Sequence, residues 1–311
     1  MTEQLFQRDV YGETLVKLGS QDKSIVVLDA DLSSSTRTNL FAKKFPDRFF
    51  NFGVAEQNMM AAAAGLASAG KTVFVSTFAV FAAGRAWDQV RVAISYNNFN
   101  VKIVATHAGI TVGPDGASHQ ALEDIALMRV LANMNIIVPS DAPQTEDAIL
   151  AAAHNSGPFY IRLGRSKVPT IENKGEFKFG RAQLLTQGDD LAIMACGSMV
   201  VQGLIAVKNL AAQGIKARLI NLHTLRPLDR EIILKAARET KLIVVCEEHN
   251  IFGGLASSVD EVVAENFPVK VLRIGVRNRF GQSGESEELL KEYNLSSLDI
   301  ERTVLANISS K

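Results

Sequence analysis

Short apolar runs, each ended by polar or glycine-containing residues and followed by a helical pattern, recur along this chain of 311 residues. Strands that are apolar throughout and separated by helices pair in parallel and are covered by helices on both faces. The pattern therefore predicts an α/β fold, with ligands beyond the carboxyl ends of the strands. In the first half, strands are expected at 24–28, 72–75, 101–105 and 136–138, and helices at 4–18, 54–69, 85–94, 120–131 and 143–154.

The periodicity fades between residues 164 and 190 and then resumes, which divides the chain into two parts. A chain of this length can form two domains, each with a full core. We expect a first domain over 1–165, a linker over 166–188 and a smaller second domain over 189–311. Each domain is predicted to be a mostly parallel sheet with helices on both faces. In the second domain, strands are expected at 191–195, 216–220, 242–246 and 269–274.

Charge and composition exclude several classes of protein. The 33 basic side chains balance 33 acidic ones and are scattered along the chain, so neither nucleic acid nor an anionic membrane surface is an expected partner. The first nine residues lack the apolar core of a signal peptide, and no stretch of about twenty residues is continuously apolar. Cys196 and Cys246 end apolar runs without a metal-ligand spacing, so both are expected to be reduced core thiols. These features predict a cytoplasmic protein.

A single carboxylate begins the most apolar of the predicted helices. Glu56 is the one charged residue between positions 54 and 69, so this helix is expected to be buried on nearly every side. A carboxyl group in such surroundings loses solvation, and its pKa rises unless a cation or several donors meet it. Glu56 is therefore a candidate acid. The alternative is that its charge merely complements the helix dipole in the first turn.

Two phenylalanines stand three residues apart after the second predicted strand. Phe78 and Phe81 lie where a parallel sheet binds ligands, and an aromatic face can stack on a flat heterocycle. The alternative is that both rings pack in the core. On the following predicted helix, we expect Arg85, Asp88 and Arg91 to form a solvated or interfacial charge ladder.

The most polar loop, residues 106–120, contains three glycines, a proline and two of the five histidines. Loops of this kind are usually functional or disordered. His119 precedes a predicted helix and could shuttle protons near neutral pH, whereas His107 could hydrogen-bond a substrate oxygen. The alternative is that both are surface residues. A second strand end, residues 31–37, offers hydroxyls and backbone donors to a ligand, or a cap to the next helix.

Three segments, in this order, resemble the carboxyl-terminal half of transketolase, which consists of a pyrimidine-binding domain and a C-terminal domain. The first segment is Gly-Val-Ala-Glu-Gln at 53–57. The second is Ser-Thr-Phe at 76–78, continued by Phe81 and by Asp-Gln-Val-Arg at 88–91. The third is Thr-His at 106–107 followed by Gly-Pro-Asp-Gly-Ala-Ser-His-Gln at 113–120. Each motif alone is weak, but all three occur at the family's spacing, and the resemblance spans nearly the whole chain.

The resemblance implies thiamine diphosphate as the cofactor. Glu56 matches the acid that hydrogen-bonds the aminopyrimidine ring and favours its imino form. The cofactor then breaks a carbon-carbon bond of a ketose phosphate, such as xylulose 5-phosphate, and passes the two-carbon unit to an aldose phosphate, such as ribose 5-phosphate. His119 matches a residue that assists proton transfer. The residues matched to the cofactor are Glu56, Phe78, Phe81 and Asp31, and those matched to the sugar phosphate are Arg8, Ser35, His107, Asp115, His119 and Arg165.

One departure from the family pattern concerns the diphosphate. Thiamine enzymes of this family hold the diphosphate and a divalent cation such as Mg²⁺ through a Gly-Asp-Gly motif followed by an Asn, and this sequence has no such triplet. Residues 113–116 with Asn133 imitate the motif only loosely. We therefore expect a separate N-terminal transketolase subunit that carries the motif. The resemblance implies a heterotetramer of two plus two subunits with the active site between chains.

Three other functions are weighed against this one. The beta subunit of a 2-oxoacid dehydrogenase has the same two-domain layout, but its substrate has no phosphate for Arg8 and Arg165 to hold. A deoxyxylulose-phosphate synthase is chemically closer, but it normally carries all its domains in one chain. A noncatalytic assembly subunit is disfavoured because Glu56, both phenylalanines and both loop histidines are retained.

Overall fold

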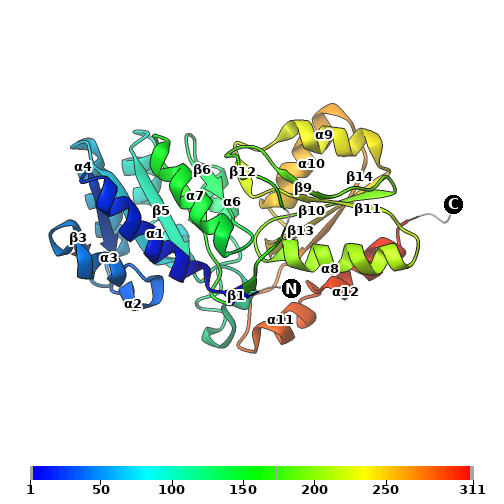
Figure 1. Ribbon diagram of the computed structural model, residues 1–311, viewed down its shortest axis with the longest axis horizontal. Coiled ribbons are helices and arrows are strands. Elements are labelled where there is room, and N and C mark those ends of the chain that lie inside the picture. The colour runs from blue at the N-terminus through cyan, green and yellow to red at the C-terminus, as the bar shows by residue number, and fades with distance from the viewer. Residues whose placement is uncertain (1–2, 173, 309–311) are drawn as a thin grey trace.

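The computed structural model describes residues 3–172 and 174–308 and contains two α/β domains side by side (Figure 1). A seven-stranded sheet forms the centre of the first domain, and a five-stranded sheet forms the centre of the second. β1 (Gln4–Leu5) and β8 (Val168–Pro169) form a separate antiparallel pair. The predicted fold class, an α/β protein of two mostly parallel sheets, is confirmed.

The first sheet has the strand order β12-β6-β7-β5-β4-β2-β3, and every neighbouring pair except β12 with β6 is parallel. Its strands are β2 (Ile25–Asp29), β3 (Phe49–Asn51), β4 (Thr72–Phe78), β5 (Val101–Thr106), β6 (Asn135–Ile137), β7 (Phe159–Arg162) and β12 (Thr224–Arg226). β2 and β5 are buried along their whole length. Their uninterrupted apolar sequences reflect this burial on both faces.

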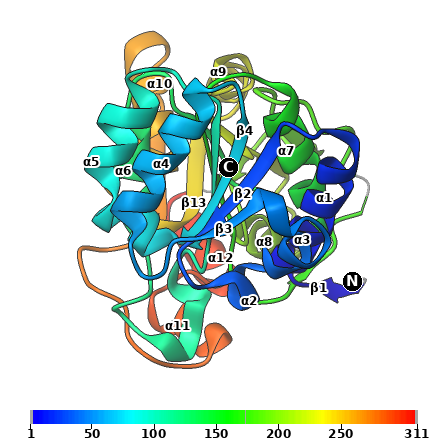
Figure 2. The ribbon, with the colours of Figure 1, turned by 90° about the vertical axis from the view of Figure 1, so that its left-hand side faces the viewer.

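Helices cover both faces of the first sheet (Figure 2). One face carries α1 (Gln7–Gln21), α3 (Asn39–Lys44) and α7 (Ala142–His154), and the other carries α4 (Glu56–Ser68), α5 (Trp87–Gln89) and α6 (Asp124–Arg129). In α1, the side chains of Tyr11, Leu15 and Leu18 recur every three or four residues and are buried in one cluster. This spacing places an apolar stripe on the side of the helix that faces the sheet.

The second sheet has the strand order β14-β13-β10-β11-β9, and only β9 is antiparallel to its neighbour. Its strands are β9 (Gln183–Thr186), β10 (Leu191–Ala195), β11 (Ala217–Asn221), β13 (Leu242–Asn250) and β14 (Lys270–Val276). α8 (Met199–Ala212) and α12 (Ser297–Leu305) cover one face, and α9 (Arg230–Glu239) and α10 (Leu255–Asn266) cover the other (Figure 1). α11 (Ser286–Glu292) lies below this sheet, toward the first domain.

The two domains share structure as well as a border. β12 follows β11 in the chain, yet it pairs with β6 and so extends the first sheet. One cluster of buried apolar side chains also runs from Met60 of the first domain to Leu222 and Leu225 of the second. The domains are therefore held to each other by backbone pairing and by a common core.

Several predicted boundaries differ from the structure. The strands expected at 72–75 and 242–246 extend to Phe78 and Asn250, and β3, β7 and β12 were not expected. The second sheet gains β9 from residues expected to form the linker, because this strand pairs with β11. The helix expected at 120–131 covers only α6, since Ala121 forms a β-bridge with Ala108 instead. The prediction that His119 directly precedes a helix is therefore wrong.

The expected burial of the helix at 54–69 is only partly correct. α4 begins at Glu56, and its buried face consists of Glu56, Met59, Met60, Ala63 and Ala64. The opposite face, which includes Gln57 and Ala61, is exposed in the isolated chain. An almost uncharged helix thus leaves one side for a further contact.

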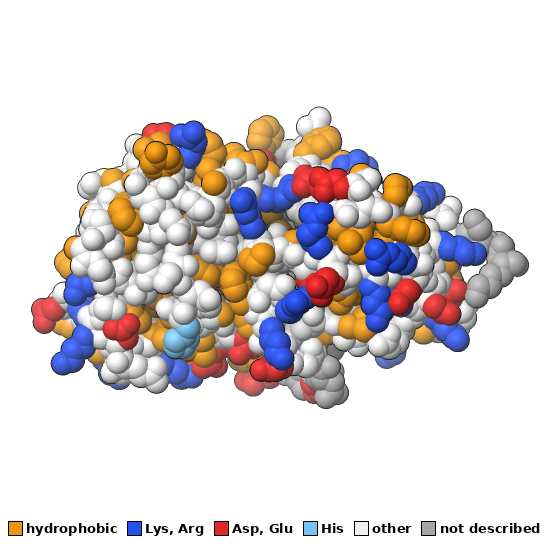
Figure 3. All heavy atoms as spheres, turned by 90° about the horizontal axis from the view of Figure 1, so that it is seen from above, with side chains coloured by type: hydrophobic (Ala, Val, Ile, Leu, Met, Phe, Trp, Pro, Cys, Tyr) orange, Lys and Arg blue, Asp and Glu red, His pale blue; other side chains and the backbone are white. Residues whose placement is uncertain are grey.

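The described surface carries charges of both signs. Basic and acidic side chains intermingle over the second domain when the molecule is seen from above (Figure 3). Among residues 3–172 and 174–308, no helix has both the length and the apolar character required to span a bilayer.

Candidate active site

The carboxyl ends of three neighbouring strands of the first sheet carry most of the predicted site residues. Phe78 is the last residue of β4, His107 follows β5, and Asp31 follows β2 after one intervening residue. These strands are adjacent in the order β5-β4-β2. The site therefore lies at the edge where a parallel sheet binds ligands.

Four aromatic side chains form one cluster at this edge. The rings of Phe78 and Phe81 are nearly parallel, with centroids 6.0 Å apart and an angle of 16° between their planes. His107 stacks on Phe78 with a centroid distance of 3.8 Å, and His119 meets the edge of Phe81 at 5.5 Å. The cluster joins both predicted phenylalanines to both loop histidines. It offers flat faces to a planar ligand.

Glu56 is the first residue of α4, and only 2% of it is exposed. Nη1 of Arg85 donates hydrogen bonds to both of its carboxylate oxygens, at 2.8 and 3.0 Å. Among the described residues, Arg85 is the one hydrogen-bond partner of the Glu56 side chain. The guanidinium also lies over the Phe81 ring, 4.5 Å from its centroid. Arg85 was expected in a solvated or interfacial charge ladder, and that prediction is wrong because it pairs with the buried carboxylate.

The local backbone explains how Arg85 reaches Glu56. The segment expected as a regular helix at 85–94 instead contains π-helical turns at Phe81–Arg85 and Val90–Ser95, with α5 between them. A π-helical turn holds one more residue than an α-helical turn, so it rotates the side chains that follow it. Such turns are frequent at functional sites.

His107 is held in a strained and buried position. Its φ angle is 58°, only 3% of the residue is exposed, and Nδ1 lies 2.9 Å from the hydroxyl of Thr106. Burial lowers the pKa of His107 to about 3, and the neighbouring charges of Arg8 and Arg165 lower it further in the same direction. A neutral imidazole hydrogen-bonds a substrate oxygen but does not act as a cationic acid. His119 is half-buried, and its Nδ1 lies 3.0 Å from the hydroxyl of Ser118.

The predicted sugar-phosphate residues include a group of like charges. Burial lowers the pKa of Arg8, and repulsion from Arg37 and Arg165 adds to this effect, although Asp9 opposes it. Nε of Arg8 is buried without a hydrogen-bond partner among the described residues. Nε of Arg165 lies 3.7 Å from a carboxylate oxygen of Asp115. Several guanidinium groups beside a single acid suit an anion such as a phosphate.

The loop after β2 is fixed by a residue that the sequence pattern did not single out. Asp29 is fully buried and accepts hydrogen bonds from the backbone N–H of Leu32 at 2.6 Å and from the hydroxyls of Thr36 and Thr38 at 2.8 and 2.9 Å. Burial raises its pKa. The predicted residues lie on this loop: Asp31 is exposed and accepts from Nδ2 of Asn51 at 2.9 Å, and Ser35 is half-buried in the short helix α2 (Ser33–Thr36).

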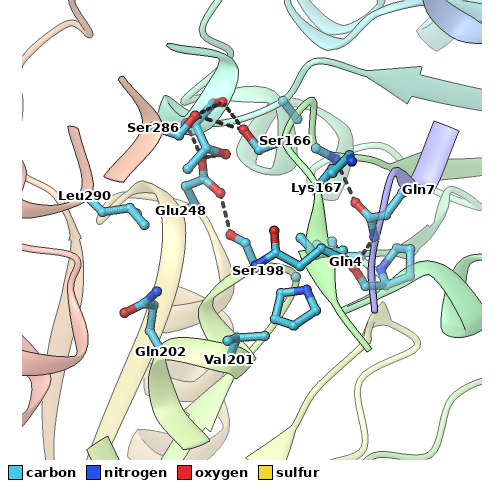
Figure 4. A pocket seen from close by; sticks show the side chains of 18 of the residues that line it. Gln4, Gln7, Ser166, Lys167, Ser198, Val201, Gln202, Glu248, Ser286 and Leu290 are labelled. Atoms are coloured by element: carbon cyan, nitrogen blue, oxygen red, sulfur yellow. Dashed lines mark hydrogen bonds between the residues drawn. The ribbon is translucent and has the colours of Figure 1, made fainter. Parts of the chain in front are cut away.

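The second domain holds the loop that carries both histidines (Figure 4). Oε1 of Glu248 accepts from the backbone N–H and the hydroxyl of Thr111 at 2.6 and 2.7 Å, and Oε2 accepts from Ser198. Ser286 and Ser166 both donate to the carbonyl oxygen of Thr111, at 2.9 Å. These residues border an interdomain cavity of about 300 Å³. Sequence reasoning missed this network, although two adjacent acids at the end of an apolar run were a visible signal.

Two family models match the chain: the transketolase pyrimidine-binding domain over residues 3–170 and the transketolase C-terminal domain over residues 180–300. The chain belongs to the transketolase family. The resemblance seen in the three motifs is thereby confirmed.

Relatives of similar length are also transketolase proteins. The chain is 47% identical over 308 residues to a putative transketolase C-terminal section of Methanocaldococcus jannaschii, covering 98% of this chain and 96% of that protein. It is 39% identical over 300 residues to one subunit of the apulose-4-phosphate transketolase of Phocaeicola vulgatus, covering 96% of each. The solved structure of a split gene transketolase, an inactive β4 tetramer, has a TM-score of 0.90 and 48% identity over 98% of this chain and 99% of that one.

A transketolase pyrimidine-binding domain implies thiamine diphosphate, and part of the site fits this cofactor. The buried carboxylate of Glu56 can meet a ring nitrogen, and the Phe81 ring beside it can meet the face of the same ring. For the diphosphate and its cation the fit is absent, because residues 3–172 and 174–308 contain no group of three or more His, Cys, Asp or Glu side chains that could hold a metal ion. Within transketolase, the described residues thus match the pyrimidine half of the cofactor site.

Proposed function

We propose that this chain is the C-terminal subunit of a thiamine diphosphate-dependent transketolase. In this proposal the enzyme moves a two-carbon ketol unit from a ketose phosphate to an aldose phosphate. The observation that carries the proposal is the position of Glu56, a buried carboxylate beside the aromatic cluster at the ligand-binding edge of the sheet. The guanidinium groups of Arg8 and Arg165 near the same edge support a phosphorylated substrate.

In the proposed cofactor site, Glu56 holds the aminopyrimidine ring through one of its nitrogens, while Phe78 and Phe81 pack against the ring and Asp31 lies near the thiazolium. When bound, thiamine diphosphate supplies a carbon nucleophile and an electron sink for cleavage of the carbon-carbon bond. The protein contributes the proton that Glu56 shares with the ring nitrogen. Its burial excludes water from that exchange.

The substrate is held by groups from four segments. Arg8 and Arg165 bind the phosphate, and Ser35 and Asp115 hydrogen-bond sugar hydroxyls. His107, with its lowered pKa, donates or accepts as a neutral ring, whereas His119 transfers a proton to or from a substrate oxygen. The salt bridge between Asp115 and Arg165 aligns a hydroxyl-binding and a phosphate-binding group in one pocket.

A separate N-terminal subunit completes the proposed enzyme. It supplies the Gly-Asp-Gly motif that binds the diphosphate and Mg²⁺, and two copies of each subunit form a heterotetramer. This part is supported by the two matched domains and by relatives that are a C-terminal section, one transketolase subunit among others and a split gene transketolase. The exposed side of α4 is a surface that such a partner could cover.

The proposed substrates and location are those of a central metabolic transketolase. Xylulose 5-phosphate and ribose 5-phosphate are the first pair to test, in the pentose phosphate pathway of the cytoplasm. Two free, buried cysteines suit a reducing compartment. One relative is named for apulose 4-phosphate, so other phosphorylated sugars belong in the same screen.

The proposal is tested by mixing this chain with the co-purifying subunit, thiamine diphosphate and Mg²⁺, and by measuring two-carbon transfer between these sugars. Glu56→Gln keeps the shape of the side chain, and we expect it to lower kcat by about 10² to 10⁴. Glu13→Gln is the matched control, because Glu13 is exposed on α1. Turnover by this chain alone, or an unchanged rate in Glu56→Gln, would contradict the proposal.

A further inference from the structure

Arg85 occupies both groups that the proposed function assigns to the pyrimidine ring. Its Nη1 lies 2.8 and 3.0 Å from the two carboxylate oxygens of Glu56. Its Cζ lies 4.5 Å from the centre of the Phe81 ring. A pyrimidine cannot bind the same oxygen and the same ring face while the guanidinium remains there.

The backbone holds Arg85 in this place from two sides. Arg85 ends the π-helical turn Phe81–Arg85, so it is on the same short segment as the ring that it covers. Nε2 of Gln57 donates to the carbonyl oxygen of Arg85 at 3.1 Å. Glu56 and Gln57, two successive residues of α4, therefore contact the side chain and the backbone of Arg85, respectively.

The guanidinium offers the same chemistry as the ring that it would replace. It is planar, it stacks on aromatic faces, and it presents N–H donors to a carboxylate. A protonated aminopyrimidine is also planar and presents N–H donors at its edge. We propose that Arg85 is a positioning residue that takes the place of the cofactor's pyrimidine in the free subunit and is displaced when the cofactor binds. This inference rests on the proposed function.

Such a stand-in solves a physical problem of the unassembled chain. Glu56 is buried, and a buried carboxylate without a partner is strongly unfavourable. Arg85 supplies the opposite charge, and its side chain is 48% exposed, so an open path to solvent allows it to leave. The cost is competition, because any ligand that needs Glu56 must first break this ion pair.

The test compares the affinity of the mixed subunits for thiamine diphosphate in the presence of Mg²⁺, measured by calorimetry. Arg85→Ala removes the competing group, and we expect its Kd to fall by about tenfold. Arg85→Lys retains a cation without a flat guanidinium and should give an intermediate Kd. The matched control is Arg91→Ala, which removes an exposed arginine from the neighbouring π-helical turn and should leave the Kd unchanged. An unchanged or weaker affinity in Arg85→Ala would overturn the inference.

A second measurement uses the free chain without any cofactor. Arg85→Ala leaves the Glu56 carboxylate buried and unpaired, so the urea midpoint should fall more at pH 8 than at pH 5, where protonation relieves the unpaired charge. The double variant Glu56→Gln/Arg85→Ala should lose this pH dependence. Equal losses at both pH values would show that the pair does not stabilise the free chain and would overturn the inference. If no mixture binds thiamine diphosphate, the proposed function fails together with the inference. If the wild-type mixture binds but Arg85→Ala has no effect on affinity, only the inference fails.

Discussion

Replacing Glu248 by alanine should release the loop that carries the two active-site histidines. Glu248 belongs to the second domain and is 4% exposed, and one of its oxygens accepts both the backbone N–H and the hydroxyl of Thr111. Thr111 itself is buried, so the truncation leaves two donors without an acceptor. Each such loss costs about 1–3 kcal/mol. We expect the loop to open more easily by about 2–3 kcal/mol in total, after partial relief by water.

Hydrogen exchange measures this opening directly, without the assumption that a two-domain protein unfolds in one step. A change of 2–3 kcal/mol corresponds to roughly 30- to 150-fold faster exchange of the Thr111 amide. Peptides that cover residues 106–120 should show the increase by mass spectrometry, whereas peptides from α1 should not. His107, Asp115 and His119 lie on the same loop, so KM for the sugar phosphate should rise in the mixed enzyme.

Glu248→Gln is the matched control for this experiment. Its amide oxygen can still accept from Thr111, and its NH₂ group can donate to the hydroxyl of Ser198. We expect exchange within about fivefold of the wild-type rate. If Glu248→Ala does not fold, Ser286→Ala removes one of two donors to the Thr111 carbonyl and gives a milder test. The reasoning is refuted if Glu248→Ala folds and its loop exchanges at the wild-type rate.

Two further predictions concern titratable groups. The pKa of His107 is lowered from 6.5 to about 3, so between these pH values the unfolded chain binds more protons and the protein loses stability as the pH falls. His107→Gln should therefore have a smaller loss of urea midpoint between pH 7 and pH 5 than the wild type, and an equal loss would contradict the assignment. Cys196 and Cys246 are fully buried, and burial raises the pKa of both thiols. The native chain should not react with a thiol reagent at pH 8 until denaturant is added, and stoichiometric labelling of the native protein would contradict this burial.

The parts of the fold that follow from local patterns could be predicted from the sequence. β2, β4 and β5 are uninterrupted apolar runs, and their carboxyl ends bring Phe78 and His107 together as parallel pairing requires. The one boundary error that affects the site is at His119. Residues 120–123 have a helix-like composition, but tertiary pairing of Ala121 with Ala108 overrides it.

The remaining parts depend on contacts between distant residues, which no local pattern encodes. Arg85 meets Glu56 across 29 positions and through a π-helical turn that apolar periodicity does not reveal. Glu248 meets Thr111 across 137 positions and from the other domain. β12 joins the first sheet only because the second domain folds against it. In each case the side chain was visible in the sequence but its partner was not.

The central claim is that this chain provides the pyrimidine half of a thiamine diphosphate site that a separate subunit completes. Calorimetric titration of thiamine diphosphate with Mg²⁺ into this chain, into the co-purifying subunit and into their mixture tests the claim most directly. We predict binding at one cofactor per pair of chains in the mixture, with affinity reduced at least about tenfold in Glu56→Gln. Equally tight binding by this chain alone, or a mixture in which Glu56→Gln binds like the wild type, would contradict the account.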